Sequence, residues 1–300
     1  MGTLTKQIYR YTHPRSMRHN ENLWPFVKIQ RNANDAISLL TYKNENVPLV
    51  DLSALKGFYA GEVLLTATGP SIKNIDFSRI PSLPTVGVNG AWHLNKYLHF
   101  DIYIIVDMLF IDNKPEILKE IICNRDLILF TTTHGIIRLI DKFSLENIQC
   151  QIAIIEDKCY QIYKPTIKKS DINKNFALEK SVIFSDANND IAFNYDIRSG
   201  IFDAGTVVYW SLQVLAFLGF NKIYIAGLDM NNFSSPRFYE TQKEMLPSFL
   251  ADKLDSLIIP AFKLARYALN EHHVEVINLS IESAVPSHIF SKMDYSDAFK

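Results

Sequence analysis

The sequence predicts an α/β fold of the Rossmann-like type, in which a mostly parallel sheet carries helices on both faces. Two observations lead to this prediction. Beyond residue 60, short continuous apolar runs alternate with segments of helical periodicity, which is typical of parallel strands buried on both sides. Each apolar run is followed by small or polar residues, as expected where strands end at the ligand-binding edge of an open sheet.

Four apolar runs predict the first strands of this sheet. They are residues 62–67, 85–88, 101–106 and 126–130, and a turn follows each of them. Between the last two runs, residues 113–123 carry Ile117, Leu118, Ile121 and Ile122. This spacing places the four side chains on one face of a helix.

The second half of the chain continues the alternation. Residues 204–218 are apolar on nearly every side, which predicts a buried helix that ends at Gly219. Residues 222–226 and 274–277 predict two further strands. An apolar helical stripe begins at Leu254 and runs through Pro260, where we expect a kink. Residues 156–200 show no regular pattern and receive no assignment.

We expect two parts in the chain, an N-terminal basic and aromatic extension of residues 1–60 and a Rossmann-like domain of residues 61–300. Before Glu21, the extension contains Lys6, Arg10, Arg15 and Arg18 and no acidic residue. It forms either a solvated terminus or a basic arm that is attracted to anionic lipid. Within the larger part, residues 231–251 are rich in Asn, Ser and charged residues, and we expect them to form a small lid over the strand ends.

The composition limits the class of protein. The 300 residues are 48% hydrophobic and 21% charged, which suffices for a sizeable core. A formal net charge of −1 argues against a nucleic-acid-binding protein, which normally has a basic excess. Three cysteines without metal-ligand spacing fit a reducing compartment, and no apolar run approaches the roughly 18 residues that span a bilayer. We expect a cytoplasmic protein; peripheral contact with the inner membrane and self-association into a homo-oligomer stay open.

The candidate site consists of the residues that follow the predicted strands. They are Thr68, Gly69, Pro70, Ser71, Asn89, Gly90, Asp107, His134 and Asp229. The turn at residues 69–71 offers a close backbone and a hydroxyl, which suit a phosphate or a ribose, and the Asn89 amide can bind a base or ribose edge. Structural alternatives exist for each residue type, because Gly and Asn favour turns and Asp caps helices. A histidine at a strand end is more often a satisfied hydrogen-bonding group than a base.

Several motifs are missing from the chain. It contains no P-loop, no nucleophile elbow, no HExxH and no pair of metal-binding aspartates in the strand-end loops. We therefore expect neither a metal ion nor a cofactor.

Two stretches carry a resemblance to a known family. Residues 67–81 read Ala-Thr-Gly-Pro-Ser-Ile-Lys-Asn-Ile-Asp-Phe-Ser-Arg-Ile-Pro, and residues 219–229 read Gly-Phe-Asn-Lys-Ile-Tyr-Ile-Ala-Gly-Leu-Asp. Both resemble conserved blocks of the bacterial CMP-sialic acid sialyltransferases, whose fold is GT-A-like. The chain is more closely similar to the related transferases that add a side-branch 3-deoxy-D-manno-octulosonic acid (Kdo) to the lipopolysaccharide inner core. This closer likeness also includes Val88-Asn89-Gly90, Asp107, residues 236–240 and residues 245–247, and the resemblance spans roughly residues 60–280.

The resemblance implies a CMP-activated donor, CMP-Kdo, and a lipopolysaccharide core or lipid-linked acceptor. It implies that Gly69, Pro70, Ser71 and Asn89 hold the CMP, with Asp107 near the ribose or the sugar. Thr206 aligns with a position that lies near the donor in this family, and residues 231–251 would form the lid that closes over the donor. Transfer in these families is inverting and needs no metal ion.

The identity of the proton acceptor stays open. The sialyltransferases place a catalytic His after the lid, whereas this chain has no His between His134 and His272. An inverting transfer needs a base for the acceptor hydroxyl, and the candidates are Asp107, Glu240 and His134. Arg237 and Tyr239 are candidates for binding the phosphate or the sugar carboxylate. The alternatives to Kdo transfer are a sialyltransferase, or another CMP-nonulosonate transferase, of the same fold, and a non-catalytic protein that binds a nucleotide or glycolipid.

Overall fold

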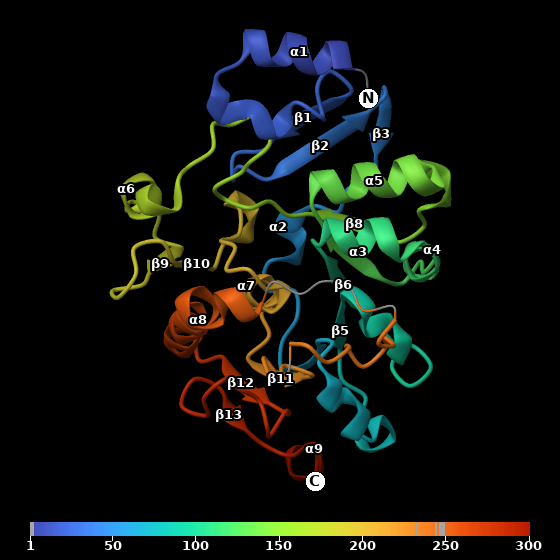
Figure 1. The fold of residues 1–300 in the computed structure, drawn as a ribbon, viewed down its shortest axis with the longest axis vertical. Helices are drawn as coiled ribbons and strands as arrows, with labels where there is room; N and C mark the ends of the chain where they lie inside the picture. The colour runs from blue at the N-terminus through green and yellow to red at the C-terminus, as the bar shows by residue number, and fades with distance from the viewer. Residues whose placement is uncertain (1–2, 232, 244, 246–249) are drawn as a thin grey trace.

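An eight-stranded sheet runs through the centre of the computed structural model, which describes residues 3–231, 233–243, 245 and 250–300 (Figure 1). The strands follow the order β13-β12-β11-β4-β5-β6-β7-β8, and every neighbouring pair is parallel. Their bounds are β4 Glu62–Thr66, β5 Thr85–Val88, β6 Ile102–Ile105, β7 Ile128–Thr131, β8 Gln151–Ile154, β11 Lys222–Ala226, β12 Glu275–Asn278 and β13 Ser291–Lys292. The predicted α/β fold with a parallel sheet is confirmed.

Helices cover both faces of this sheet. Alternate residues of each strand point to opposite sides, so Val63 and Leu65 of β4 lie in one core and Leu64 lies in the other. The first core contains α7 (Val207–Leu218) and α8 (Ile259–Glu271), and the second contains α3 (Met108–Asn113), α4 (Pro115–Ile122) and α5 (Thr133–Phe143).

The predicted elements agree with the observed ones within two or three residues at most ends. Helix α7 begins after Thr206 and ends at Gly219, whose φ of 105° is the left-handed conformation that favours glycine. The helix expected from Leu254 is divided into a π-helical turn, Leu254–Ile258, and α8. Pro260 lies in the first turn of α8, directly after the π-helical turn, so the regular α-helical hydrogen-bond pattern changes beside the proline.

The chain also forms elements that the sequence did not reveal. Strands β8 and β13 extend the two edges of the sheet, and α5 follows β7. The unassigned region 156–200 contains a short helix, α6 (Ile172–Phe176), and an antiparallel hairpin of β9 (Val182–Phe184) and β10 (Ala192–Asn194).

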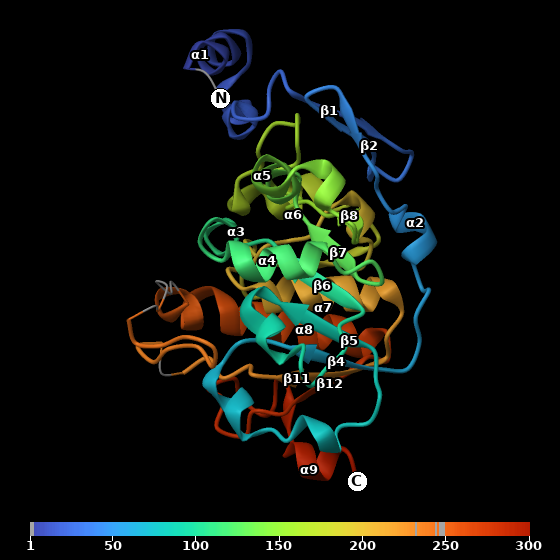
Figure 2. The same cartoon turned by 90° about the vertical axis from the view of Figure 1, so that its right-hand side faces the viewer.

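The N-terminal residues form a layer of their own at one end of the molecule, and the C-terminal helix α9 (Tyr295–Ala298) lies at the opposite end (Figure 2). This layer consists of α1 (Thr3–Thr12) and an antiparallel sheet of β1 (Val27–Arg31), β2 (Ile37–Tyr42) and β3 (Glu45–Val47). The short helix α2 (Leu52–Leu55) follows it and packs into the core of the central sheet through Leu52 and Leu55. None of the described helices combines the length and the apolar character needed to cross a membrane.

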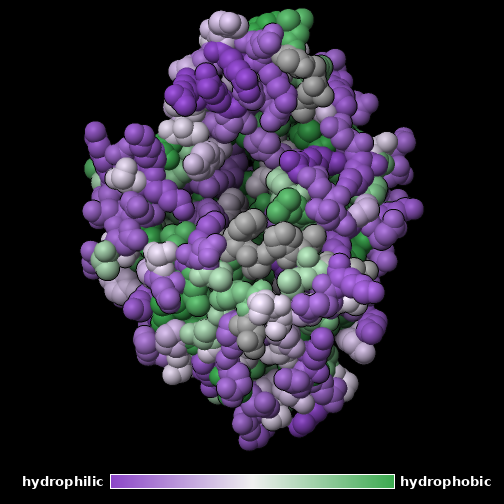
Figure 3. All heavy atoms as spheres, in the orientation of Figure 1, coloured by the Kyte–Doolittle hydropathy of each residue, from purple (hydrophilic) through white to green (hydrophobic). Residues whose placement is uncertain are grey.

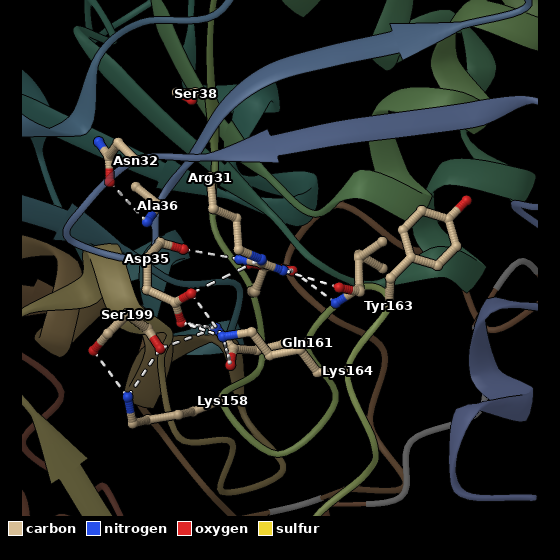
Figure 4. Close-up of polar contacts among 12 residues, drawn as sticks. Arg31, Asn32, Asp35, Ala36, Ser38, Lys158, Gln161, Tyr163, Lys164 and Ser199 are labelled. Carbon is tan, nitrogen blue, oxygen red and sulfur yellow. Dashed lines mark hydrogen bonds and ion pairs between the residues drawn. The ribbon is translucent and has the colours of Figure 1, made fainter. Parts of the chain in front are cut away.

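A polar network attaches this layer to the loop after β8 (Figure 4). The Arg31 guanidinium donates to both carboxylate oxygens of Glu156, at 2.5 and 2.9 Å. Lys164 donates to the Asp35 carboxylate at 2.6 Å. Because Glu156 is only 7% exposed, these contacts hold the β1–β2 hairpin firmly against the larger part of the chain.

Candidate functional site

A cavity of about 370 Å³ lies at the carboxyl ends of β4, β5, β6 and β11. Strand order reverses between β4 and β11, and ligands of open parallel sheets bind at such a switch point. We call it the strand-end cavity. It is lined by nine predicted site residues: Thr68, Gly69, Pro70, Asn89, Asp107, Thr206, Asp229, Arg237 and Glu240.

The turn after β4 brings the backbone close to the end of β11. The Gly69 N–H donates to the Gly227 carbonyl at 3.0 Å. A Cβ at Gly69 would lie 2.5 Å from Oδ2 of Asp229, so a side chain at this position would displace the carboxylate. Glycine is therefore required here by a close approach, with Pro70 starting the 3₁₀ turn Pro70–Asn74 that follows.

Asp229 is the buried carboxylate of this turn and is 6% exposed. Its Oδ2 accepts the Ser71 backbone N–H at 2.8 Å. Its Oδ1 is buried and has no hydrogen-bond partner within the described part of the chain. The Ser71 hydroxyl pairs with the Ser280 hydroxyl at 2.8 Å, so Ser71 supports Asp229 through its backbone and does not line the cavity.

Asn89 provides a second buried acceptor. Its backbone has a φ of 45°, and its carbonyl accepts the Tyr103 hydroxyl at 2.7 Å. Its side-chain Oδ1 is buried without a hydrogen-bond partner among the described residues. Buried acceptors are nearly always satisfied. Two unsatisfied acceptors on residues that line one cavity are suited to a ligand with hydroxyl or amino groups, such as a ribose or a nucleobase.

Asp107 and Thr206 line the cavity and also cap helices. Oδ1 of Asp107 accepts the N–H groups of Leu109 and Phe110, at 2.8 and 3.4 Å, and begins α3. The Thr206 hydroxyl accepts the Val208 N–H at 3.4 Å and begins α7. A helix N-terminus favours negative charge, so the start of α7 at the cavity is suited to a phosphate.

The described part of the predicted lid contributes an ion pair to the cavity. Nη1 of Arg237 lies 2.7 Å from Oε1 of Glu240, whose side chain is fully buried. Residues 232, 244 and 246–249 of the lid, and with them Leu246 and Pro247 of the matched motif, lie outside the described residues.

Tyr239 lies beside the strand-end cavity, with its ring against Gly90. A Cβ at Gly90 would lie 2.0 Å from the Tyr239 ring, so Gly90 makes room for that ring and does not line the cavity. Burial raises the pKa of the Tyr239 hydroxyl, and the neighbouring Arg237 opposes this effect. The hydroxyl stays protonated at neutral pH and can donate a hydrogen bond.

His134 is not brought to the cavity. It lies in the first turn of α5, where its Nε2 is 3.4 Å from the His19 carbonyl of the N-terminal layer. Burial lowers its pKa. The structure therefore gives His134 a packing position between two parts of the chain.

Sequence reasoning did not find Asp203, Lys253 and His93. Asp203 and Lys253 line the cavity; Oδ1 of Asp203 accepts the Trp210 indole N–H at 2.8 Å. His93 stacks on Tyr239 with ring centroids 5.1 Å apart. The Asp-Ala-Gly-Thr turn before α7 could have pointed to Asp203, whereas Lys253 and His93 reach the site only through tertiary packing. No three His, Cys, Asp or Glu side chains of the described residues are grouped so as to hold a metal ion.

Comparison with solved structures finds similarity to a sialyltransferase. One is sialyltransferase CstII from Campylobacter jejuni in complex with a substrate analogue, cytidine-5'-monophosphate, at 14% identity and a TM-score of 0.42, covering 77% of this chain and 84% of that one. Another is the same sialyltransferase with a trisaccharide acceptor and CMP, at 14% identity and a TM-score of 0.41, covering 77% and 85%. No curated protein matches the sequence.

A family model gives the decisive match. It is described as 3-deoxy-D-manno-octulosonic acid transferase WaaZ and matches residues 50–296, which is most of the chain and includes every residue of the candidate site. The resemblance to the Kdo transferases is confirmed. The chain belongs to the WaaZ family of 3-deoxy-D-manno-octulosonic acid transferases and is a glycosyltransferase.

Proposed function

We propose that this protein transfers Kdo from CMP-Kdo to the lipopolysaccharide inner core, with inversion at the sugar and without a metal ion. The observation that supports it most strongly is the pair of buried, unsatisfied acceptors, Oδ1 of Asn89 and Oδ1 of Asp229, in a cavity at the switch point of the sheet. A ribose or cytosine supplies the hydroxyl and amino donors that these two oxygens lack.

In the proposed donor complex, the turn at Thr68, Gly69 and Pro70 holds the nucleotide backbone. The N-terminus of α7, at Thr206, stabilises the negative charge of the donor phosphate. Arg237 binds the phosphate or the sugar carboxylate, because a guanidinium can bind either with two parallel hydrogen bonds. The protonated Tyr239 hydroxyl donates to the leaving phosphate.

Transfer requires one bond to form and one to break. The acceptor hydroxyl oxygen attacks the anomeric carbon of Kdo, and the bond from that carbon to the phosphate oxygen breaks, releasing CMP. Asp107 is the first candidate for taking the hydroxyl proton, because it lines the cavity. The hydrogen bonds that cap α3 use only its Oδ1 atom among the described residues. Glu240 is less suited, since it is paired with Arg237.

We also propose that the protein contacts a membrane surface through α1, because the acceptor is lipid-linked. Leu4, Ile8 and Tyr11 are 68%, 41% and 92% exposed and fall on one helical face by their spacing. Figure 3 shows a small apolar cluster at this end of the molecule, surrounded by hydrophilic surface. Cosedimentation with vesicles containing anionic lipid should decrease for Ile8→Ser and Tyr11→Ser, and unchanged binding would contradict this part.

The experiment that tests the function is a transfer assay with CMP-Kdo and a deacylated core oligosaccharide. The product is a core oligosaccharide that has gained one Kdo, detected by mass spectrometry, together with one CMP released per transfer. Activity should persist in EDTA. CMP-sialic acid in place of CMP-Kdo identifies a sialyltransferase if it is the better donor, and binding of CMP without any transfer identifies a non-catalytic protein.

A further inference from the structure

A second cavity, of about 550 Å³, adjoins the strand-end cavity across the segment of residues 237–240. Arg237 and Glu240 line the strand-end cavity, whereas Phe238 and Tyr239 line the second one. We call the second one the aromatic cavity. Its volume lies within the range of small-molecule sites, and no residue of the proposed donor site other than Tyr239 lines it within the described chain.

The aromatic cavity is lined by rings from three separate segments. Phe77 and Tyr97 stack with centroids 6.5 Å apart, and His93 stacks on Tyr239 at 5.1 Å. Phe238 meets His93 edge-on at 6.4 Å. Tyr97 is 62% exposed, although its apolar ring would favour burial. The apolar C–H faces of sugar rings pack on aromatic surfaces of this kind.

The lining also has an excess of positive charge. Lys73 and Lys96 are exposed at its edge, and Nζ of Lys96 lies 4.8 Å from the centre of the Tyr97 ring. The one carboxylate of the lining, Asp76, uses Oδ1 to accept the N–H and hydroxyl of Ser78, at 3.1 and 2.6 Å. The two ammonium groups therefore favour an anionic ligand, bearing a carboxylate or a phosphate.

His93 connects this cavity to the proposed chemistry. Its ring lines the aromatic cavity and stacks on Tyr239. Burial, with Lys114 and Lys96 nearby, lowers the pKa of His93. A neutral imidazole can accept a hydrogen bond from a sugar hydroxyl, so the cavity offers polar as well as apolar recognition next to the donor site.

We infer that the aromatic cavity binds an acidic saccharide, the acceptor of the transfer, with sugar rings against Phe77, Tyr97 and Phe238 and its anionic groups at Lys73 and Lys96. This inference rests on the proposed function, since it assigns the acceptor to the cavity that adjoins the donor. A neutral saccharide should bind more weakly, because it leaves both lysines without a counter-charge.

The test separates acceptor binding from donor binding. The probes are the deacylated core oligosaccharide, which carries carboxylates, and a neutral oligosaccharide of similar length. Two variants alter the cavity, Tyr97→Ala and the double variant Lys73→Gln/Lys96→Gln. Two matched controls, Tyr267→Ala and Lys263→Gln, change an exposed tyrosine and an exposed lysine of α8.

Each cavity variant should raise the acceptor KM by about tenfold, with the CMP dissociation constant and the melting temperature unchanged. The lysine variant should also lose most of the preference for the acidic probe and the salt dependence of its binding. The two control variants should have the same acceptor KM, CMP dissociation constant and melting temperature as the unaltered protein. An unchanged acceptor KM in both cavity variants, with CMP still bound, overturns the acceptor assignment alone, whereas failure of the unaltered protein to bind CMP overturns the proposed function.

Discussion

The Asp229 carboxylate accepts the backbone N–H of Ser71 at 2.8 Å, and this contact joins the residues that follow β11 to those that follow β4. The second oxygen of the same carboxylate is buried without a hydrogen-bond partner in the described chain. One oxygen thus fixes the carboxylate, and the other is an unpaired acceptor at the switch point of the sheet.

The first prediction concerns Asn89, which carries an unsatisfied acceptor, and Ser71, whose hydroxyl is paired. Asn89→Ala should weaken CMP binding by about 1–3 kcal/mol, since a ligand donor loses its partner. Ser71→Ala should weaken it less, because the Ser71 hydroxyl pairs with Ser280. Calorimetric titration measures the CMP affinity of both variants. Equal CMP affinities for the Asn89 variant and the unaltered protein would remove Asn89 from the site.

The second prediction concerns the leaving phosphate. Tyr239→Phe should lower kcat more than it raises the donor KM, because the hydroxyl acts as the bond to phosphate breaks. The ring that packs on Gly90 and His93 is retained, so folding should be unaffected. Arg237→Ala should lower kcat in the same way and also lower stability by about 3 kcal/mol, since the buried Glu240 loses its guanidinium partner.

Steady-state kinetics with CMP-Kdo and a melting curve separate these effects. Tyr267→Phe, an exposed tyrosine on α8, is the matched control for Tyr239→Phe. A kcat near that of the unaltered protein in Tyr239→Phe, with normal melting, would show that this residue only packs against the sheet.

The third prediction concerns the N-terminal layer. Arg31→Ala removes the partner of the buried Glu156 carboxylate and should lower the free energy of unfolding by about 3 kcal/mol. Lys43→Ala, in the turn after β2, is the control: Lys43 and Asp141 are 58% and 44% exposed, and exposed pairs contribute about 0–1 kcal/mol. Urea denaturation of both variants is the measurement, and similar small losses would show that the network does not fasten the layer.

The fourth prediction concerns pH. Burial raises the pKa of Asp157 from 3.8 to about 7, and the neighbouring Asp203 adds to this effect. Between pH 4 and 7 the folded protein holds a proton that the unfolded chain has released, so stability decreases as pH rises through this window. Asp157→Asn can still accept the Cys159 N–H, which lies 2.8 Å from Oδ1, and carries no charge.

Asp157→Asn should therefore exceed the unaltered protein in stability by on the order of 4 kcal/mol at pH 8, with the difference in stability shrinking towards pH 4. Thermal melts across this range measure it, with Asp190→Asn, an exposed position, as the control. A stability difference between Asp157→Asn and the unaltered protein that stays constant from pH 4 to 8 would contradict the raised pKa of Asp157.

The central sheet could be predicted because its strands are short apolar runs with clear ends. Residues 85–88 were expected and form β5, and residues 222–226 form β11. Strand β13 consists of Ser291 and Lys292, whose side chains carry no strand pattern. It exists because β12 offers an unpaired edge, which is a tertiary cause. The β1–β2 hairpin likewise depends on contacts with residues 156–164.

The candidate site could be predicted where it depends on strand ends. Gly69, Asn89 and Asp229 each follow a strand, so their convergence is a consequence of the parallel topology. The position of His134 could not be foreseen, because it depends on packing against the N-terminal layer. The stacking of His93 on Tyr239 joins residues that are far apart in sequence, and no local pattern reports such a contact.

The most direct test of a CMP site in the strand-end cavity is a calorimetric titration of the unaltered protein with CMP, CDP, UDP and S-adenosylmethionine. We expect that CMP binds with one site per chain, that Asn89→Ala weakens this binding, and that UDP and S-adenosylmethionine bind far more weakly. Tight binding of UDP or S-adenosylmethionine, with no heat from CMP, would contradict the claim that the strand-end cavity is the site of a CMP-activated sugar.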